Sequence, residues 1–112
     1  MIQEYSFGKI VINDKIYSKD LYLFNDKVFE NWRRKNGHNV QIEDLEEILR
    51  LKPKKIIFGT GAFGLMKVSK KVKELLDSNN IEYVSKKTAK AYEIYNNLDD
   101  KRYVVAAFHL TC

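Results

Sequence analysis

The chain has 112 residues, 45% of them hydrophobic and 12% aromatic, so it can bury one core, and we expect a single domain over residues 1–112. Its net charge of +5 comes from lysines interspersed with 15 acids, a distribution typical of a solvated surface that argues against a nucleic-acid partner. The single cysteine excludes an internal disulfide framework and a cysteine-rich zinc site. Because the start of the sequence lacks a secretion signal and no apolar run approaches the roughly 18 residues of a membrane span, we expect a cytoplasmic protein that does not cross a membrane.

The first quarter of the chain is predicted to form strands. Residues 5–12 (YSFGKIVI) and 15–24 (KIYSKDLYLF) are rich in Ile, Val, Tyr and Phe. Asn13-Asp14 between them fits a hairpin turn, because both residues tolerate left-handed backbone. Gly8, inside the first run, indicates either a bulge or a close approach of two backbones. We expect a β-hairpin followed by a third strand near residues 21–24.

The middle of the chain begins with a polar, glycine-containing segment, residues 31–40 (NWRRKNGHNV), which is predicted to be a loop. The next segment, IEDLEEILRLKP, has apolar residues at helical spacing, acids early and basic residues late. Pro53 ends it. A short amphipathic helix is therefore expected before residue 53.

The C-terminal half alternates between strands and helices. Strands are predicted at residues 55–58, 81–84 and 103–108. One helix is expected to begin near Ser69, a good N-cap residue, and another is opened by Thr88. Two right-handed β-α-β units with three parallel strands follow from this order. The predicted class is α/β, with the β-hairpin added in front.

Residues 55–64 (KIIFGTGAFG) contain a G-x-G-x-x-G pattern directly after a predicted strand. Such glycines can let backbone N–H groups approach an anion, or they can simply form a tight turn. A helix start at Ser69 leaves a long loop, and the end of the second strand reads Ser85-Lys86-Lys87 where a dinucleotide site needs an acid. No cofactor is therefore predicted, while a smaller anion or polar ligand at the loop stays open.

The loop NWRRKNGH offers Trp32, Arg33, Arg34 and His38, which together suit a carboxylate or phosphate. The alternative is that the tryptophan packs on the core and the arginines are solvated. The sequence alone does not separate these interpretations.

Two further polar pairs lie near the C-terminus. Tyr95-Asn96, on the last predicted helix, either reaches the glycine loop or only packs and caps that helix. His109 and Cys112 do not by their spacing specify a nucleophilic pair, because such a pair needs a hydrogen-bonded arrangement and an oxyanion site. We expect them to be structural.

Short motifs run in one order over nearly the whole chain: Phe7-Gly8, Tyr17, Asp20, Trp32-Arg33, Gly37-His38, Asp44-Leu45, IIFGTG with Gly64, Tyr95-Asn96 and AAFHLTC. In these motifs the chain resembles the small Mth-type domain family, whose members include an adipogenesis-associated protein and a mitochondrial complex I assembly factor. The resemblance implies a three-layer fold, in which a mixed central sheet has helices on one side and the hairpin plus a helix on the other. It implies no established enzymatic activity.

Two functions stay open at this point. The lack of a complete catalytic constellation, with the assembly-factor relative, favours a non-enzymatic binding or assembly-type protein, a monomer or homodimer with an unknown protein partner. The alternative is a small-molecule or anion-binding protein, an enzyme included, with its site at the loop 59–64. The candidate ligand-binding residues are Gly59, Thr60, Gly61, Gly64, Arg33, His38, Tyr95 and Asn96.

Overall fold

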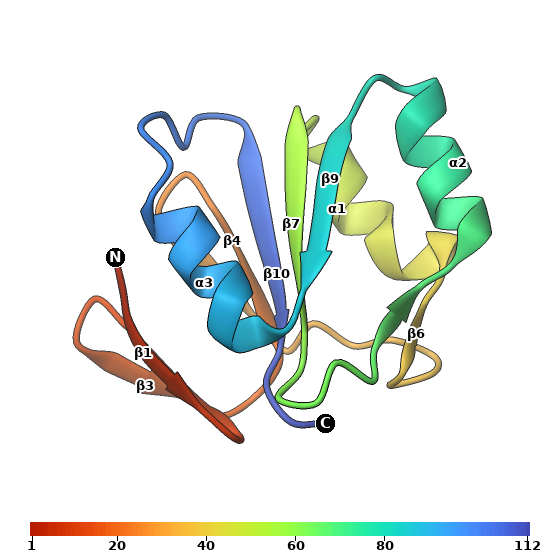
Figure 1. Cartoon of the computed structure of the whole chain (residues 1–112). Helices are drawn as coiled ribbons and strands as arrows, with labels where there is room; N and C mark the ends of the chain where they lie inside the picture. Colours follow the sequence, from red (N-terminus) through yellow and green to blue (C-terminus); the bar gives the residue numbers. More distant parts are fainter.

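The computed structural model describes residues 1–112 around a central five-stranded sheet of order β5-β4-β10-β7-β9 (Figure 1). Its strands are β4 (Leu21–Phe24), β5 (Lys27–Glu30), β7 (Lys55–Thr60), β9 (Glu82–Lys86) and β10 (Val104–His109). β10, β7 and β9 are parallel, whereas β4 runs antiparallel to β10 and β5 antiparallel to β4. The three predicted parallel strands are confirmed, and the sheet is mixed, as the family resemblance implied.

The N-terminal strands form a second, antiparallel sheet of β1 (Ile2–Ser6), β2 (Lys9–Ile12) and β3 (Lys15–Tyr17). The turn between β2 and β3 is the predicted one, because Asn13 and Asp14 have φ values of 49° and 67°. Residues 5–12 are not one strand, however, since Gly8 lies in the turn between β1 and β2. The Gly8 N–H donates to the carbonyl oxygen of Leu110 at 2.8 Å, so the glycine marks a close backbone approach and no bulge.

The helical segments are η1 (Ile42–Leu45), α1 (Glu46–Arg50), α2 (Lys70–Ser78) and α3 (Thr88–Asn96), and a short parallel pair joins β6 (Asn39–Val40) to β8 (Lys67–Val68). Ser69 is the N-cap of α2, as predicted, and its Oγ accepts a hydrogen bond from the Val72 N–H at 3.2 Å. Thr88 opens α3 but does not cap it. Its hydroxyl instead donates to the carbonyl oxygen of His109 at 2.6 Å. None of the helices is long and apolar enough to span a membrane.

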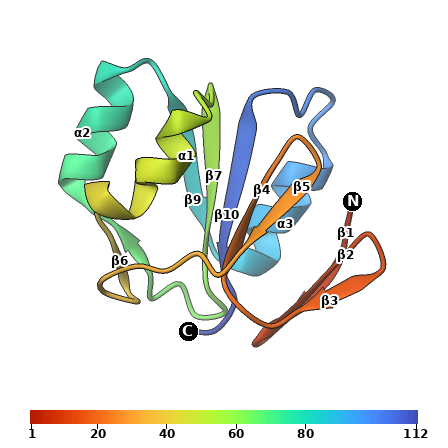
Figure 2. The same ribbon diagram turned by 180° about the vertical axis from the view of Figure 1, so that it is seen from behind.

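Two apolar cores cover the two faces of the central sheet. Along β7, Ile56 and Phe58 belong to the core under α1 and α2, and Ile57 belongs to the core shared with α3 and the N-terminal sheet. This alternation follows from the two-residue period of a strand, and it explains why β7 and β10 are buried along nearly their whole length and are mostly apolar. Figures 1 and 2 show α1 and α2 on one side, with α3 and the β1 to β3 sheet on the other. The implied three-layer arrangement is confirmed.

Candidate functional site

The carboxyl ends of β7, β9 and β10 meet at one edge of the sheet, where ligands commonly bind in α/β folds. The glycine loop follows β7 at this edge. Gly61 has a φ of 99°, and a side chain there would strike the backbone of Cys112. A Cβ on Gly59 would lie only 2.6 Å from Phe108 Cδ1. These glycines are therefore required by close packing against α3, β10 and the last residues of the chain.

Most backbone N–H groups of this loop are bonded within the protein. Gly61 N–H donates to Thr88 Oγ1 at 2.9 Å, Ala62 N–H to Thr111 O at 2.6 Å and Leu65 N–H to Cys112 O at 3.0 Å. An amide already bonded in this way does not cradle an anion. The G-x-G-x-x-G pattern thus shapes a strand exit, and side chains have to supply donors for a ligand at this edge in place of these three amides.

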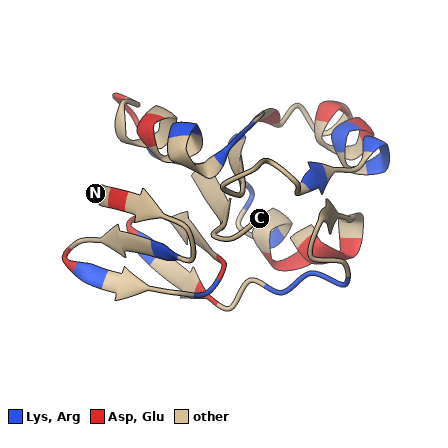
Figure 3. Ribbon diagram, turned by 60° about the horizontal axis from the view of Figure 1, so that its bottom comes forward, with Lys and Arg blue, Asp and Glu red and all other residues tan.

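Side chains for that purpose line a cavity of about 480 Å³ beside the loop, here called the lysine cavity. Thr60, Met66 and Val68 form its buried floor. The other lining residues are Phe63, Gly64, Lys67, Lys73, Ser85, Lys86 and Lys87. No acid lines the cavity, and none of its lysines takes part in an ion pair of this structure. Figure 3 shows basic residues on β8 and after β9, both basic and acidic residues on α2, and several acidic residues on η1 and α1.

Gly64 lines the lysine cavity close to Lys67, Lys87 and Thr60. Lys67 Nζ donates to the Gly64 carbonyl oxygen at 3.4 Å. A Cβ on Gly64 would lie 3.4 Å from Lys87 Cγ and 3.6 Å from Thr60 Oγ1. Two lysine side chains and one hydroxyl group therefore lie around the same peptide.

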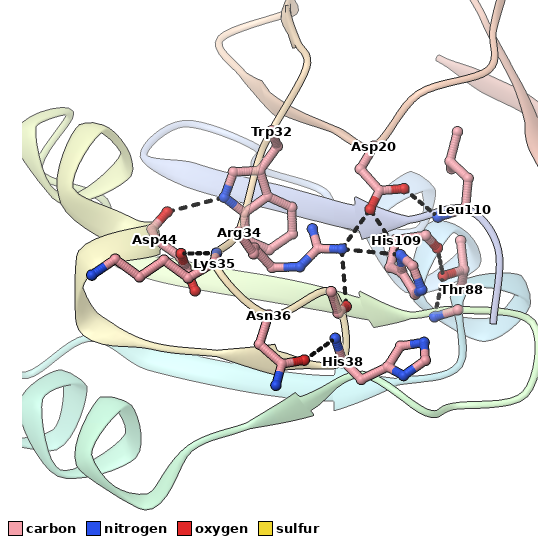
Figure 4. Close-up of polar contacts among 12 residues, drawn as sticks. Asp20, Trp32, Arg34, Lys35, Asn36, His38, Asp44, Thr88, His109 and Leu110 are labelled. Atoms are coloured by element: carbon pink, nitrogen blue, oxygen red, sulfur yellow. Dashed lines mark hydrogen bonds and ion pairs between the residues drawn. The ribbon is translucent and has the colours of Figure 1, made fainter.

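A buried polar cluster lies next to this cavity and consists of Asp20, Arg34 and His109 (Figure 4). Asp20 Oδ2 is 2.6 Å from Arg34 Nη2 and 2.7 Å from His109 Nδ1. Asp20 Oδ1 accepts a hydrogen bond from the Leu110 N–H at 2.8 Å. The side chains of Asp20, Arg34 and His109 are only 18%, 3% and 7% exposed. The carboxylate is thus held by three donors from two distant parts of the chain, the loop that contains Arg34 and the end of β10.

Protonation within the cluster follows from its geometry. Burial alone raises the pKa of the Asp20 carboxyl, but hydrogen bonds from His109, Arg34 and the Leu110 N–H, with the charge of Arg34, outweigh it and lower the pKa below its ordinary value. An ionised carboxylate only accepts, so His109 Nδ1 carries the proton that faces Asp20. His109 Nε2 and Arg34 Nε and Nη1 are buried without a hydrogen-bond partner.

The cluster anchors the loop 31–38 across the edge of the sheet. The Arg34 guanidinium lies 4.6 Å from the centre of the Trp32 ring, and Trp32 Nε1 donates to Asp44 O at 3.0 Å. His109 is the register partner of Thr60, a floor residue of the lysine cavity. The exposed His38 ring meets His109 edge-on, with ring centroids 5.9 Å apart. The buried cluster is therefore next to the lysine cavity, because its His109, on β10, pairs with Thr60 on β7.

The structure divides the candidate residues named from the sequence. Thr60 and Gly64 line the lysine cavity, whereas Gly59 and Gly61 serve close packing. Arg33 and His38 do not line it, and the carbonyl of His38 accepts the Lys67 N–H at 2.8 Å. Of the sequence alternatives for NWRRKNGH, Trp32 packs in the core, and Arg34, not Arg33, is buried.

Tyr95 and Asn96 lie at the C-terminal end of α3, whereas Thr88, which contacts the glycine loop, lies at its N-terminal end. Tyr95 is 3% exposed within the core. Asn96 Nδ2 donates to Ile2 O at 2.6 Å, and its Oδ1 accepts the Ile2 N–H at 3.2 Å. Both polar atoms of Asn96 are thus occupied in fastening β1, and of the sequence alternatives the packing role fits this geometry.

A second cavity, of about 400 Å³, lies between β4, the end of β5, the loop after it and α1. Its wall contains Arg33 and the aromatic side chains of Tyr22, Phe29 and Trp32, and its acids are Glu30, Glu43, Asp44, Glu46 and Glu47. No group of three or more His, Cys, Asp or Glu side chains is arranged to hold a metal ion. The lysine cavity, which is lined by four lysines and two hydroxyl side chains and by no acid, is therefore the better candidate site for an anion.

Comparison with known proteins agrees with this fold. The model of a family described as "Protein of unknown function (DUF498/DUF598)" matches residues 2–109, which confirms the resemblance drawn from the sequence motifs. The solved structure of PH1505, a conserved hypothetical protein from Pyrococcus horikoshii OT3, is similar with a TM-score of 0.85 at 24% identity, covering 100% of this chain and 99% of that one.

Two further solved structures are similar over most of their length. A protein named MT938 has 28% identity and a TM-score of 0.79, with 100% of this chain and 98% of that chain covered. XCC1710 from Xanthomonas campestris, a structural genomics target, has 20% identity and a TM-score of 0.82, with 98% and 83% covered. No curated protein is significantly similar to the chain in sequence.

Proposed function

This chain belongs to the DUF498/DUF598 family of proteins of unknown function, and from its side chains we propose that it binds a small anionic ligand in the lysine cavity. The supporting observation is that Lys67, Lys73, Lys86 and Lys87 surround one cavity that no acid lines. Ammonium groups held near one another repel, and an anion between them removes that repulsion. A cavity of this composition therefore favours a negatively charged occupant.

Phosphate-bearing ligands suit the donors present. Lysine ammonium groups contribute point charges with several N–H donors, and the hydroxyls of Thr60 and Ser85 add uncharged donors beside them. The amino end of α2 lies at the same place, because Val68 and Lys73 line the cavity on either side of the Ser69 cap. The positive end of a helix dipole adds to the attraction. The volume of about 480 Å³ is within the range of small-molecule sites.

The sequence also favoured an assembly-type role with a protein partner in the cytoplasm, and both of these stay predictions. Neither depends on the lysine cavity. The anionic-ligand proposal can be tested directly, because the lysines that line the cavity can be substituted one by one.

Calorimetric titration with pyrophosphate tests the proposal. The double variant Lys73→Gln/Lys87→Gln removes two of the cavity charges, and we expect its affinity to fall by at least roughly tenfold, equivalent to a loss of about 1.4 kcal/mol. Lys71→Gln is the matched control, because Lys71 is exposed on α2 and does not line the cavity. We expect its affinity to match that of the unmodified protein.

Salt provides a second arm of the same experiment. Raising the ionic strength from about 0.01 M to about 0.15 M shortens the Debye length from roughly 30 Å to 8 Å, so binding should weaken but persist. An equal loss of affinity in the Lys71→Gln control would show diffuse surface attraction and refute the site. Absence of pyrophosphate binding at low salt would refute the function itself.

A further inference from the structure

We propose that the ligand of the lysine cavity is a nucleoside phosphate, whose base stacks on Phe63 while its phosphates lie among the lysines. This rests on the function proposed above and adds a ring-binding half to the same site. Phe63 lines the cavity, and its ring contacts that of Phe7 with centroids 6.1 Å apart and planes tilted by 47°. The two rings together are called the aromatic platform.

The aromatic platform is exposed although it is apolar. Phe7 is 57% and Phe63 is 64% exposed, and Leu65, two residues after Phe63 in the chain, is 46% exposed. A contiguous exposed apolar patch rimmed by polar groups is a common feature of binding surfaces. Here the neighbouring polar groups are the ammonium groups of the cavity. A phenyl ring in this position offers a π face to any planar base, and it does so next to the donors that suit phosphate.

The platform is positioned from the backbone. The turn that carries Phe7 is fixed by the bond from Gly8 N–H to Leu110 O at 2.8 Å. The loop that carries Phe63 is fixed by the bond from Ala62 N–H to the neighbouring Thr111 O at 2.6 Å. The backbone segments that carry the two exposed rings are thus both held by the same end of the chain. A surface ordered before binding loses less entropy when a ligand arrives, which favours affinity.

Comparing ADP with pyrophosphate isolates the stacking contribution, because both present a diphosphate and only ADP has a base. We expect ADP to bind the unmodified protein roughly tenfold more tightly in calorimetric titrations. Phe63→Leu keeps an apolar side chain but removes the π face. It should lower ADP affinity roughly tenfold, to about the level of pyrophosphate, and it should lower pyrophosphate affinity far less.

Tyr103→Leu is the matched control, since Tyr103 is an aromatic residue 50% exposed just before β10, at the opposite edge of the sheet from the cavity. It should retain the ADP preference. Because Phe63 is exposed, its variant should also keep the melting temperature of the unmodified protein. A variant that melts like the parent and loses only the ADP preference supports the stacking role.

The outcomes separate the two proposals. Equal affinity of the unmodified protein for ADP and pyrophosphate, or an ADP preference that survives Phe63→Leu, overturns the stacking role and leaves anion binding in place. If neither compound binds, both proposals fall. A titration with single-stranded oligoadenylate distinguishes a free nucleotide from a nucleic-acid strand as the ligand. Tighter, Phe63-dependent binding of the oligonucleotide assigns the site to single strands, and tighter binding of ADP assigns it to the free nucleotide.

Discussion

Replacing Asp20 with asparagine is expected to destabilise the fold more than any other single change of one carboxyl to an amide. The Asp20 carboxylate accepts bonds from Arg34 Nη2 at 2.6 Å, His109 Nδ1 at 2.7 Å and Leu110 N–H at 2.8 Å. Asparagine has the same shape but no charge, so the 3% exposed Arg34 side chain is left in the interior without a counter-charge. Breaking a buried pair in this way costs about 3–5 kcal/mol.

The assay is thermal unfolding followed by circular dichroism at neutral pH. For a domain of this size, 1 kcal/mol corresponds to roughly 4 °C, so the melting temperature should fall by about 12–20 °C. Asp99→Asn is the matched control, because Asp99 is exposed and makes no side-chain hydrogen bond. Its melting temperature should stay within about 2 °C of the parent.

A double-mutant cycle shows whether the loss of stability comes from leaving the Arg34 guanidinium without its counter-charge. Arg34→Met removes the cation and keeps an unbranched side chain beside Trp32. The combination of Asp20→Asn with Arg34→Met should then cost clearly less than the sum of the single changes. Additive losses, or equal melting temperatures for Asp20→Asn and Asp99→Asn, would refute the reasoning.

The remaining predictions concern pH and the backbone. Because the folded state lowers the pKa of Asp20, the contribution of this carboxylate to stability is complete above the ordinary carboxyl pKa of about 4 and is lost as the pH falls through the lower, folded-state pKa. In urea titrations from about pH 6 to about pH 2, the free energy of unfolding should therefore fall less steeply with decreasing pH in Asp20→Asn than in the parent. Equal pH dependence in the two proteins would contradict this. Gly61→Ala, at a φ of 99° against the backbone of Cys112, should lower the free energy of unfolding by more than about 1 kcal/mol, whereas Gly37→Ala, with no atom within 4 Å of the new methyl group, should be nearly neutral. Ser69→Ala removes the cap of α2 and should cost about 1 kcal/mol by chemical denaturation, and no measurable loss would show that the cap bond adds nothing to stability.

Local signals made much of the fold predictable. The Ser69 cap and the Asn13-Asp14 turn depend on neighbouring residues alone, and both are confirmed. β5 was missed although Asn25-Asp26 before it has the same left-handed backbone, with φ values of 51° and 63°. That turn could have been found by the same rule. β6 and β8 are two residues each, and they exist only because the chain brings them together.

The site was less predictable because tertiary structure assembles it. Asp20 and His109 are 89 positions apart in the chain, and Asp20 and Arg34 are 14 apart. No local pattern links them. The basic run Lys86-Lys87 was visible, but in the sequence it was interpreted as scattered surface charge and as the absence of a ribose-binding acid. Its meaning changed once Lys67 and Lys73 were found around the same cavity.

The position of β10 has a consequence for how the protein is made. This strand follows all the others along the chain, yet it lies between β4 and β7 and pairs with both. On the ribosome, the β4–β5 hairpin and the β7–β9 pair can form early, but each presents an unpaired apolar edge until residues 104–109 emerge. Pairing of Leu21 with Phe108 spans most of the sequence, and such distant contacts form slowly. We therefore expect the nascent chain to expose strand edges that favour aggregation and chaperone binding until β10 has left the ribosome and paired with β4 and β7.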